Sequence, residues 1–260
     1  MSVSLQKANF WKRISAYLFD LILTVTLAVG FATVVSAIVG YDAHSAKLEG
    51  YYAQYAEEYG IDLDISQEDY DALSEAEKQN YEAASDALAK DPEVLKLYNT
   101  MFYLTLAILA IGLFLAILAL HFIVPLFFKN GQTLGKKIFG VAVMRTNCVK
   151  VSNPVLFVRS ILGLYTIETM VPLLLLTMIY FGAIGSVGSI TIGLIMLLQI
   201  VVMAVTQTNS SIHDLLSDTV VVDFASQKIF DTEEALIAYK EALHAQEVAA
   251  QKEQGNISSD

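Results

Sequence analysis

Long stretches with almost no charge constrain this chain more than any other feature of its sequence. Residues 21–40 and 100–128 contain no Asp, Glu, Lys or Arg, and from Ser160 to Thr208 only Glu168 is charged. A helix crosses a bilayer with roughly 20 mostly apolar residues. The third stretch is long enough for two helices, which we expect to turn at Gly182–Gly188. The sequence therefore predicts an all-α membrane protein with a four-helix transmembrane bundle.

The segment boundaries follow from where charge begins and ends along the chain. The first apolar run is about twice as long as that of a signal peptide and carries Asp20, so we interpret it as a retained helix, with cleavage near Val35-Ser-Ala37 as the lesser alternative. We expect spans at 14–40, 100–128, 154–181 and 187–208, joined and flanked by an N-terminus (1–13), an acidic segment (41–99), a basic loop (129–153), a short element (209–224) and a C-terminal helix (231–251).

The distribution of charge predicts the orientation of these spans. The N-terminus holds Lys7, Lys12 and Arg13 without any acid, and the 129–153 loop holds five basic residues, again without acid. Residues 41–99 hold fifteen acidic residues against four lysines. Short basic segments stay on the cytoplasmic side of a membrane. We therefore expect both termini and the basic loop in the cytoplasm, and the acidic segment as an extracytoplasmic insertion.

The acidic insertion carries helix signals of its own. Tyr51, Tyr55 and Tyr59 repeat at helical spacing, and Ser66 and Ser74 each begin a pattern typical of a helix start. We expect a partly helical insertion whose tyrosines either pack together or lie at the lipid interface.

No pattern in the chain predicts a metal site, a cofactor site or a catalytic centre. Asp62, Asp64 and Ser66 resemble the start of a calcium loop, but Gln67 stands where that loop needs a glycine. A solvated acidic face is the better interpretation. The lone Cys148 excludes an internal disulfide. Because no nucleophile–base arrangement occurs either, we do not expect an enzyme.

Ionisable residues in or beside the apolar runs are the candidate functional residues, because a charge at bilayer depth costs several kcal/mol unless it is paired or used. Asp20 lies about 9 Å into the first span, at 1.5 Å per residue. We expect it to pair with Arg159 at the start of the third span, and we expect Arg13 to reach Asp214 just beyond the fourth. Such pairs either lock helix packing or belong to an ion or proton pathway.

Three more polar residues are candidates for a transport pathway. His121 and Gln199 lie in the same leaflet as Asp20, and Glu168 lies nearer the bilayer centre. His121 either takes a proton at physiological pH or is a buried hydrogen-bonding residue. Along the first span, small residues recur every four positions from Ala16 to Gly40, which predicts either a central helix or a dimer seam.

Four motifs occur in order along the spans. Arg13-x-x-Ala16-x-x-x-Asp20 opens the first span, Gly131-Gln-Thr-Leu-Gly-Lys-Lys-Ile-Phe-Gly140 follows the second, Arg159 opens the third, and His213-Asp214-Leu-Leu follows the last. In this order they resemble the RDD family, named for one arginine and two aspartates, here Arg13, Asp20 and Asp214. The resemblance covers roughly 7–40 and 100–224. It implies a multi-pass protein of the bacterial inner membrane, in a family often suggested to transport a substrate.

The basic loop predicts lipid contact and a small β element. Lys136 and Lys137 stand where anionic headgroups lie, with a phosphate of a substrate as the rival ligand. Val141–Arg145 and Val149–Val151 flank a Thr-Asn-Cys turn, which predicts a cytoplasmic β-hairpin, and Thr219–Asp223 is a candidate third strand.

Two functions from different classes follow from these observations. In the first, the protein is a proton- or cation-coupled transporter in which Asp20 bears the charge; four spans are few for a transport path, so it works as a homodimer or larger oligomer. In the second, it is a non-transporting accessory protein that binds a protein partner through its acidic segment or its C-terminal helix. Both place the chain in a lipid bilayer, and neither involves nucleic acid.

Overall fold

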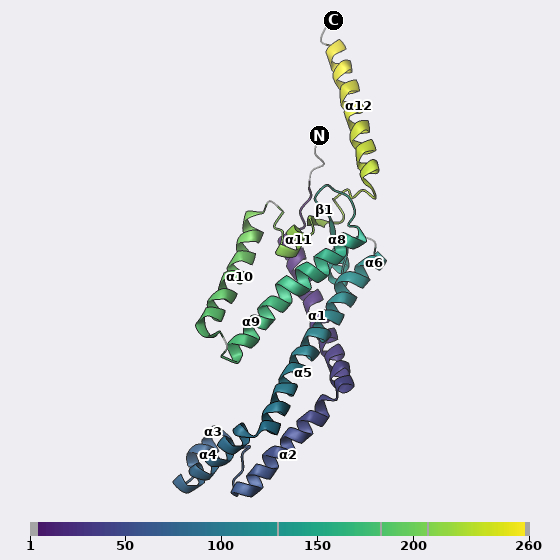
Figure 1. The fold of residues 1–260 in the computed structure, drawn as a ribbon. Coiled ribbons are helices and arrows are strands. Elements are labelled where there is room, and N and C mark those ends of the chain that lie inside the picture. Colours follow the sequence, from purple (N-terminus) through teal and green to yellow (C-terminus); the bar gives the residue numbers. More distant parts are fainter. Residues whose placement is uncertain (1–4, 129, 183, 207, 258–260) are drawn as a thin grey trace. The chain divides into compact units, whose positions relative to one another are not determined.

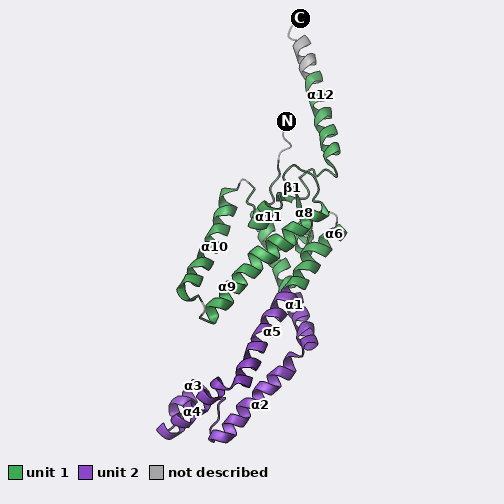
Figure 2. Ribbon diagram, in the orientation of Figure 1, with its two compact units in different colours: residues 1–26, 114–260 green, residues 27–113 purple. Residues whose placement is uncertain are grey.

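The computed structural model describes residues 5–128, 130–182, 184–206 and 208–257, with side chains as far as Ala249. Four of its helical segments are long and apolar enough to cross a membrane: Phe10–Val39, Pro92–Phe128, Asn153–Tyr180 and Gly185–Val205. The predicted number of spans is therefore confirmed. The chain divides into two compact units, residues 1–26 with 114–260 (unit 1) and residues 27–113 (unit 2), which Figure 2 colours separately.

Unit 2 folds the acidic segment into helices. Ser66 starts one of them by accepting the N–H of Asp69, and Ser74 and Glu77 cap another reciprocally, so both predicted helix starts are confirmed. The elements of unit 2 are, in order, the second part of α1 (Phe10–Val39), α2 (Tyr41–Tyr59), α3 (Gln67–Ala72), α4 (Glu75–Lys90) and most of α5 (Pro92–Ile117) (Figure 1).

The three tyrosines of α2 pack inside unit 2. They lie against a small buried cluster from the loop after α2, from α4 and from the start of α5. The hydroxyl of Tyr55 donates to Asp91 at 3.0 Å, which fixes the aspartate just before α5. Packing, rather than exposure to lipid, is thus the role of these rings. The cluster consists of Leu63, Ala84, Leu88 and Val94.

The small residues of α1 serve helix packing within the chain. In unit 2, a Cβ added to Gly112 of α5 would lie 3.0 Å from the carbonyl oxygen of Ala28 and 3.1 Å from the Cβ of Ala32. Close backbone approach of this kind needs small residues on both helices. Ala28 and Ala32 both belong to the predicted four-residue repeat, so this part of the repeat faces another helix of the same chain.

Two spanning segments contain π-helical turns, both within unit 1. Each π-helical stretch ends two residues before a proline. α5 continues through η1 (Leu118–Ile123) into α6 (Val124–Phe128), and α8 (Asn153–Phe157) continues through η2 (Val158–Met170) into α9 (Val171–Tyr180). Pro125 and Pro172 have no N–H to donate to the carbonyls of His121 and Glu168, four residues earlier. Ser160 Oγ donates to the His121 carbonyl instead, at 2.6 Å.

The last spanning helix, α10 (Gly185–Val205), leaves most of its apolar side chains exposed. Examples are Val187, Ile190, Leu194 and Ile200, each more than half exposed. Such a surface suits the hydrocarbon of a bilayer.

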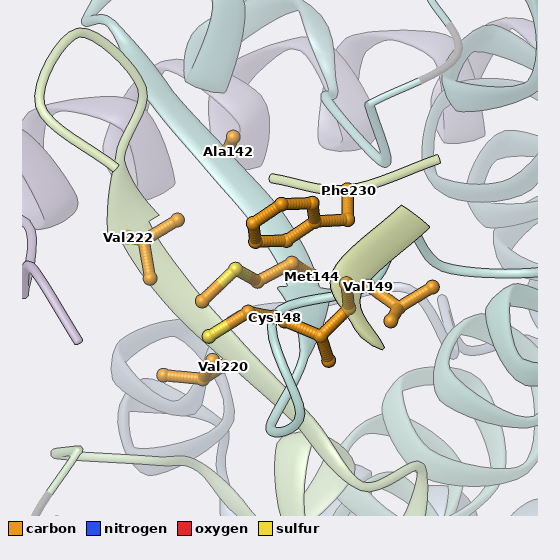
Figure 3. Close-up of a cluster of buried hydrophobic side chains, with 8 residues drawn as sticks. Ala142, Met144, Cys148, Val149, Val220, Val222 and Phe230 are labelled. Carbon is orange, nitrogen blue, oxygen red and sulfur yellow. The ribbon is translucent and has the colours of Figure 1, made fainter. Parts of the chain in front are cut away.

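A two-stranded sheet lies at one end of the spans of unit 1, together with α8 and α11 (Ile212–Leu216) (Figure 1). β1 (Val141–Arg145) pairs antiparallel with β2 (Thr219–Asp223), with Val143 opposite Val221. Both faces are covered, which explains why the strands are continuous apolar runs rather than alternating ones. Figure 3 shows the larger cluster, made of Ala142, Met144, Cys148, Val149, Val220, Val222, Phe230 and Leu236.

The predicted hairpin forms only its turn and one bridge, Met144 to Lys150, whereas the predicted strand 219–223 is confirmed. The ladder goes no further along β1, because the N–H of Val143 donates to the carbonyl of Asn130 at 3.3 Å. Phe230 pairs with the outer edge of the returning segment: its N–H donates to the carbonyl of Cys148, and its carbonyl accepts the N–H of Lys150, both at 2.9 Å. The sheet partner of β1 is therefore the distant β2.

The C-terminal helix α12 (Glu233–Ile257) meets this sheet through its first turns. Leu236 is buried in the sheet cluster, and Tyr239 packs against it beneath the ammonium of Lys228, which lies 3.4 Å from the ring centroid. A helix is thus present where 231–251 was predicted, and these two residues dock it on the sheet.

We expect Met144→Ala to destabilise unit 1, because Met144 is 0% exposed in the sheet cluster and its removal leaves a cavity. The expected loss is about 2–5 kcal/mol, measured as a lower melting temperature of the purified protein in detergent. Met203→Ala is the control, since Met203 is 37% exposed on α10. Equal melting of both variants would contradict the assignment of the sheet as the core.

Candidate functional site

Asp20 is buried between α1 and the first turn of α7 (Leu134–Ile138). Its carboxylate accepts two hydrogen bonds from that turn, one from the hydroxyl of Thr133 and one from the N–H of Gly135 at 2.8 Å. A carboxylate at a helix N-terminus satisfies donors that have no partner within the helix. Asp20 therefore caps α7 from another helix and ties the basic loop to the first span.

The Gly131–Gly140 motif is shaped for this contact. A Cβ on Gly135 would lie 2.4 Å from the carbonyl oxygen of Ala16 and 2.9 Å from the carboxyl carbon of Asp20, so no other residue fits without displacing α1. Gln132 is also buried, and its side-chain amide donates to the carbonyl of Val141 at 2.8 Å. The motif thus holds α7 between α1 and β1.

Lys136 turns inward rather than toward lipid headgroups. Its Nζ lies 4.0 Å from Asp20 and 3.3 Å from the hydroxyl oxygen of Thr133. Burial, and after it the charge of Arg159, lower the pKa of Lys136 to about 8, and Asp20 offsets only part of this. Lys137 is exposed, with its Nζ 3.9 Å from the ring centroid of Phe128, so headgroup contact stays a prediction for Lys137.

Arg13 holds the turn that follows α10. Its guanidinium donates to the carbonyl oxygens of Thr208 at 3.0 Å and Asn209 at 2.7 Å. Asn209 takes a positive φ of 51°, which directs this turn back toward α1. The first residue of the RDD pattern therefore joins the first span to the end of the fourth.

Arg159 forms the buried ion pair of the site. It donates through Nη1 to a carboxylate oxygen of Asp214 and, at 2.9 Å, to the hydroxyl of Thr219. Asp214 is 1% exposed and also caps α11, because its other oxygen accepts from Ser211. Burial alone would raise the pKa of Asp214, but the charge of Arg159 and the hydrogen bonds from Ser211 outweigh it and hold that pKa well below its ordinary value.

His213 connects this ion pair to the membrane-depth residues. Its Nε2 lies 2.9 Å from Arg159 Nη2, and its Nδ1 lies 2.8 Å from Glu168 Oε2. The backbone N–H of His213 also donates to Glu168, at 2.9 Å. Gln199 of α10 donates to the same Glu168 oxygen at 3.4 Å. Asp214, Arg159, His213, Glu168 and Gln199 therefore form one chain of polar contacts, which we call the relay.

Gly163 makes room for the relay. A Cβ there would lie 2.5 Å from the Cβ of His213, so only glycine on η2 lets α11 lie this close.

His121 forms a separate link to the first span. Its Nε2 lies 3.0 Å from the hydroxyl of Thr24, which donates to the carbonyl of Asp20 at 2.7 Å.

Both predicted ion pairs are wrong in their partners. Asp20 was expected to pair with Arg159, but α7 fills that position and Arg159 pairs with Asp214 instead. Arg13, the expected partner of Asp214, binds backbone carbonyls. Sequence reasoning gave no role to His213, although its place beside Asp214 in the last motif was a signal. Among the described residues, no cluster of His, Cys, Asp or Glu is arranged to hold a metal ion.

The fold and the site define a multi-pass membrane protein with a charged network at one end of its spans. The model of the RDD family matches residues 7–218, and the chain belongs to that family. The predicted resemblance is confirmed. No curated protein and no solved structure matches the chain.

We expect Gly135→Ala to lower the stability of the folded protein, because the added methyl group collides with Ala16 and Asp20. Overpacking of this kind costs about 1–3 kcal/mol, which a melting curve in detergent would record. Gly193→Ala is the matched control, since nothing lies within 4 Å of a Cβ on that glycine of α10. Unchanged melting of Gly135→Ala would show that α7 does not sit on Asp20.

The lowered pKa of Lys136 predicts a pH dependence. Between about pH 8 and pH 10 the folded protein binds less than one proton at this amine while the unfolded chain still binds one, so stability rises with pH. Lys136→Arg keeps its charge. We therefore expect the wild type to gain on this variant by up to about 1.4 kcal/mol per pH unit in unfolding free energy. Lys137→Arg should show no such trend, and a flat difference for Lys136→Arg would contradict its burial.

Proposed function

We propose that this RDD protein is a proton- or cation-coupled transporter whose ion site is the Glu168–His213 pair. The observation that carries the proposal is the relay itself. Glu168 stands on the third spanning segment and contacts Gln199 of the fourth, and the relay runs from there to Asp214 beyond the spans. A connected row of ionisable groups in a membrane protein is typical of ion and proton pathways.

Glu168 fits the role of ion carrier better than Asp20 does. Asp20 is 4% exposed, and both its oxygens are bound by α7, so a proton or cation there would have to break the cap. The side chains of Glu168 and His213 retain 15% and 18% exposure. Both side chains are ionisable and are joined by one hydrogen bond, which suits reversible uptake of an ion.

The charges of the site balance when His213 is neutral. Arg13, Lys136 and Arg159 oppose Asp20, Glu168 and Asp214, and the contacts described above hold each of the six. A neutral cluster in a medium of low dielectric constant is stable only until one charge is added or removed. Binding of one proton or one small cation at Glu168–His213 is therefore the event that would drive a change of conformation.

The proposal places the sheet end of unit 1 in the cytoplasm of a bacterial cell and the acidic helices outside. The support is the charge distribution, with five basic residues and no acid in 129–153 and fifteen acidic residues in 41–99. Four spans provide few walls for a transport path, so the working unit of this proposal is a homodimer. An enzymatic role is not part of it.

The test is ion flux into proteoliposomes under a pH or sodium gradient. We expect Glu168→Gln to lower the flux at least tenfold, because it removes the titrating carboxylate while keeping the side-chain shape. Asp218→Asn is the matched control, since Asp218 is exposed and its side chain contacts Thr146 and Arg145 at the sheet end. Asp20→Asn is expected to lower the yield of folded protein instead.

Absence of flux in the wild type would refute the transporter and favour an accessory protein. The structure offers one feature for that function: Ile237 and Val248 are 54% and 37% exposed on α12. Deletion of 231–260 would then be expected to abolish co-purification of a protein partner.

A further inference from the structure

The contacts of His213 fix which ring nitrogen carries its proton. A guanidinium has donors and no acceptor. Arg159 Nη2 lies 2.9 Å from Nε2 of His213, so Nε2 must accept and must be free of hydrogen. Nδ1 then carries the proton and donates it to Glu168 Oε2 at 2.8 Å. The structure therefore holds His213 as the neutral Nδ1–H tautomer.

A second proton on His213 has only one place to bind, and Arg159 occupies it. Protonation of Nε2 would set an N–H against the N–H of Arg159 and place two positive charges about 3 Å apart, which is strongly unfavourable in a poorly hydrated site. Uptake of the proton therefore requires Arg159 to leave Nε2. Arg159 would keep two hydrogen bonds after leaving Nε2, since its Nη1 donates to Asp214 and Thr219.

The protonated ring also has a carboxylate nearby. Asp214 Oδ1 lies 3.9 Å from Nε2 and would stabilise the new charge. Ser211 Oγ lies 3.1 Å from Nδ1 and 3.0 Å from Nε2, so it faces the ring and is not in line with either N–H. Asp214 and Glu168 are therefore the groups that would stabilise the protonated ring.

The groups that face His213 come from each neighbouring element. Glu168 and Arg159 face it from η2, and Ser211 and Asp214 face it from α11. From α10, Gln199 reaches it through Glu168. The carboxylates favour the protonated ring, and Arg159 opposes it.

We propose that a proton and Arg159 compete for Nε2 of His213, so that proton uptake releases the histidine from Arg159 and commits Arg159 to Asp214 and Thr219. The competition rests on the proposed function only for its role in transport. In that role, Arg159 would couple protonation of His213 to Thr219, the first residue of β2. The histidine gains one proton from water, and no bond other than hydrogen bonds is made or broken.

Nitrogen-15 NMR of histidine-labelled protein in lipid nanodiscs tests the competition. The chain has four histidines, and the spectrum of His213→Gln identifies the His213 signals by their absence. At pH 7.5 the wild type is expected to show a protonated Nδ1 and an unprotonated Nε2. A proton on Nε2 at that pH, in either the other tautomer or the doubly protonated ring, would overturn the proposal.

Replacement of the competitor gives the second arm. Arg159→Lys keeps a positive charge for Asp214 but lacks the second guanidinium nitrogen, Nη2, which contacts His213 in the wild type. His213 is then expected to take up its second proton at a pH about one unit or more higher than in the wild type. Arg145→Lys is the matched control, because Arg145 pairs with Asp218 and Glu233 at the sheet end. An unchanged titration in Arg159→Lys would overturn the competition.

The two hypotheses fail separately. The NMR measurement contains no transport step, so the expected tautomer in a protein without flux refutes the transporter alone. Flux together with a proton on Nε2 at pH 7.5 refutes the competition alone. If Arg159→Lys does not fold, the tautomer of the wild type decides.

Discussion

The structure depends on one constraint: a carboxylate inside an apolar helix must find donors, and lipid offers none. Asp20 meets this constraint by accepting from Thr133 and Gly135 at the start of α7, which lie 113 and 115 residues away along the chain but adjacent in space. That bond fixes the basic loop, and the loop fixes β1, since Gln132 donates to Val141. β1 in turn binds β2, whose first residue accepts from Arg159. A single buried charge thus determines where the sheet and the relay lie.

Two kinds of buried charge occur in unit 1, and they differ in what they permit. Asp20 is held by a backbone N–H and a hydroxyl group, neither of which titrates near neutral pH, so its environment is fixed. Glu168 is held chiefly by a histidine, whose donors change with protonation. The hydroxyls of Thr24 and Ser160 and the ring of His121 connect the neighbourhoods of these two carboxylates. Asp20 and Glu168 therefore have separate hydrogen-bond partners.

Much of the fold was predictable from the sequence, because hydropathy and capping act locally. The four spans, the helix starts at Ser66 and Ser74, the strand 219–223 and the RDD family all follow from short patterns. The partners of the charges were not predictable. Asp20 and Arg159 lie at similar depth, but depth says nothing about which helix faces which, and a loop helix filled the gap between them. The hairpin stays short for a similar reason, since nothing local shows that Asn130 takes the N–H of Val143.

The π-helical form of η2 has a geometric consequence for the relay. Arg159 and Glu168 are nine residues apart, and both contact the ring of His213. In an α-helix, nine residues make about two and a half turns, which would put these side chains on opposite faces. Bonds from residue i to i+5 widen each turn, so nine residues come close to two full turns and the two side chains share a face. Contraction of η2 to a regular α-helix would rotate one of these side chains away from the ring. The winding of this one helix therefore determines whether Arg159 and Glu168 can both contact His213.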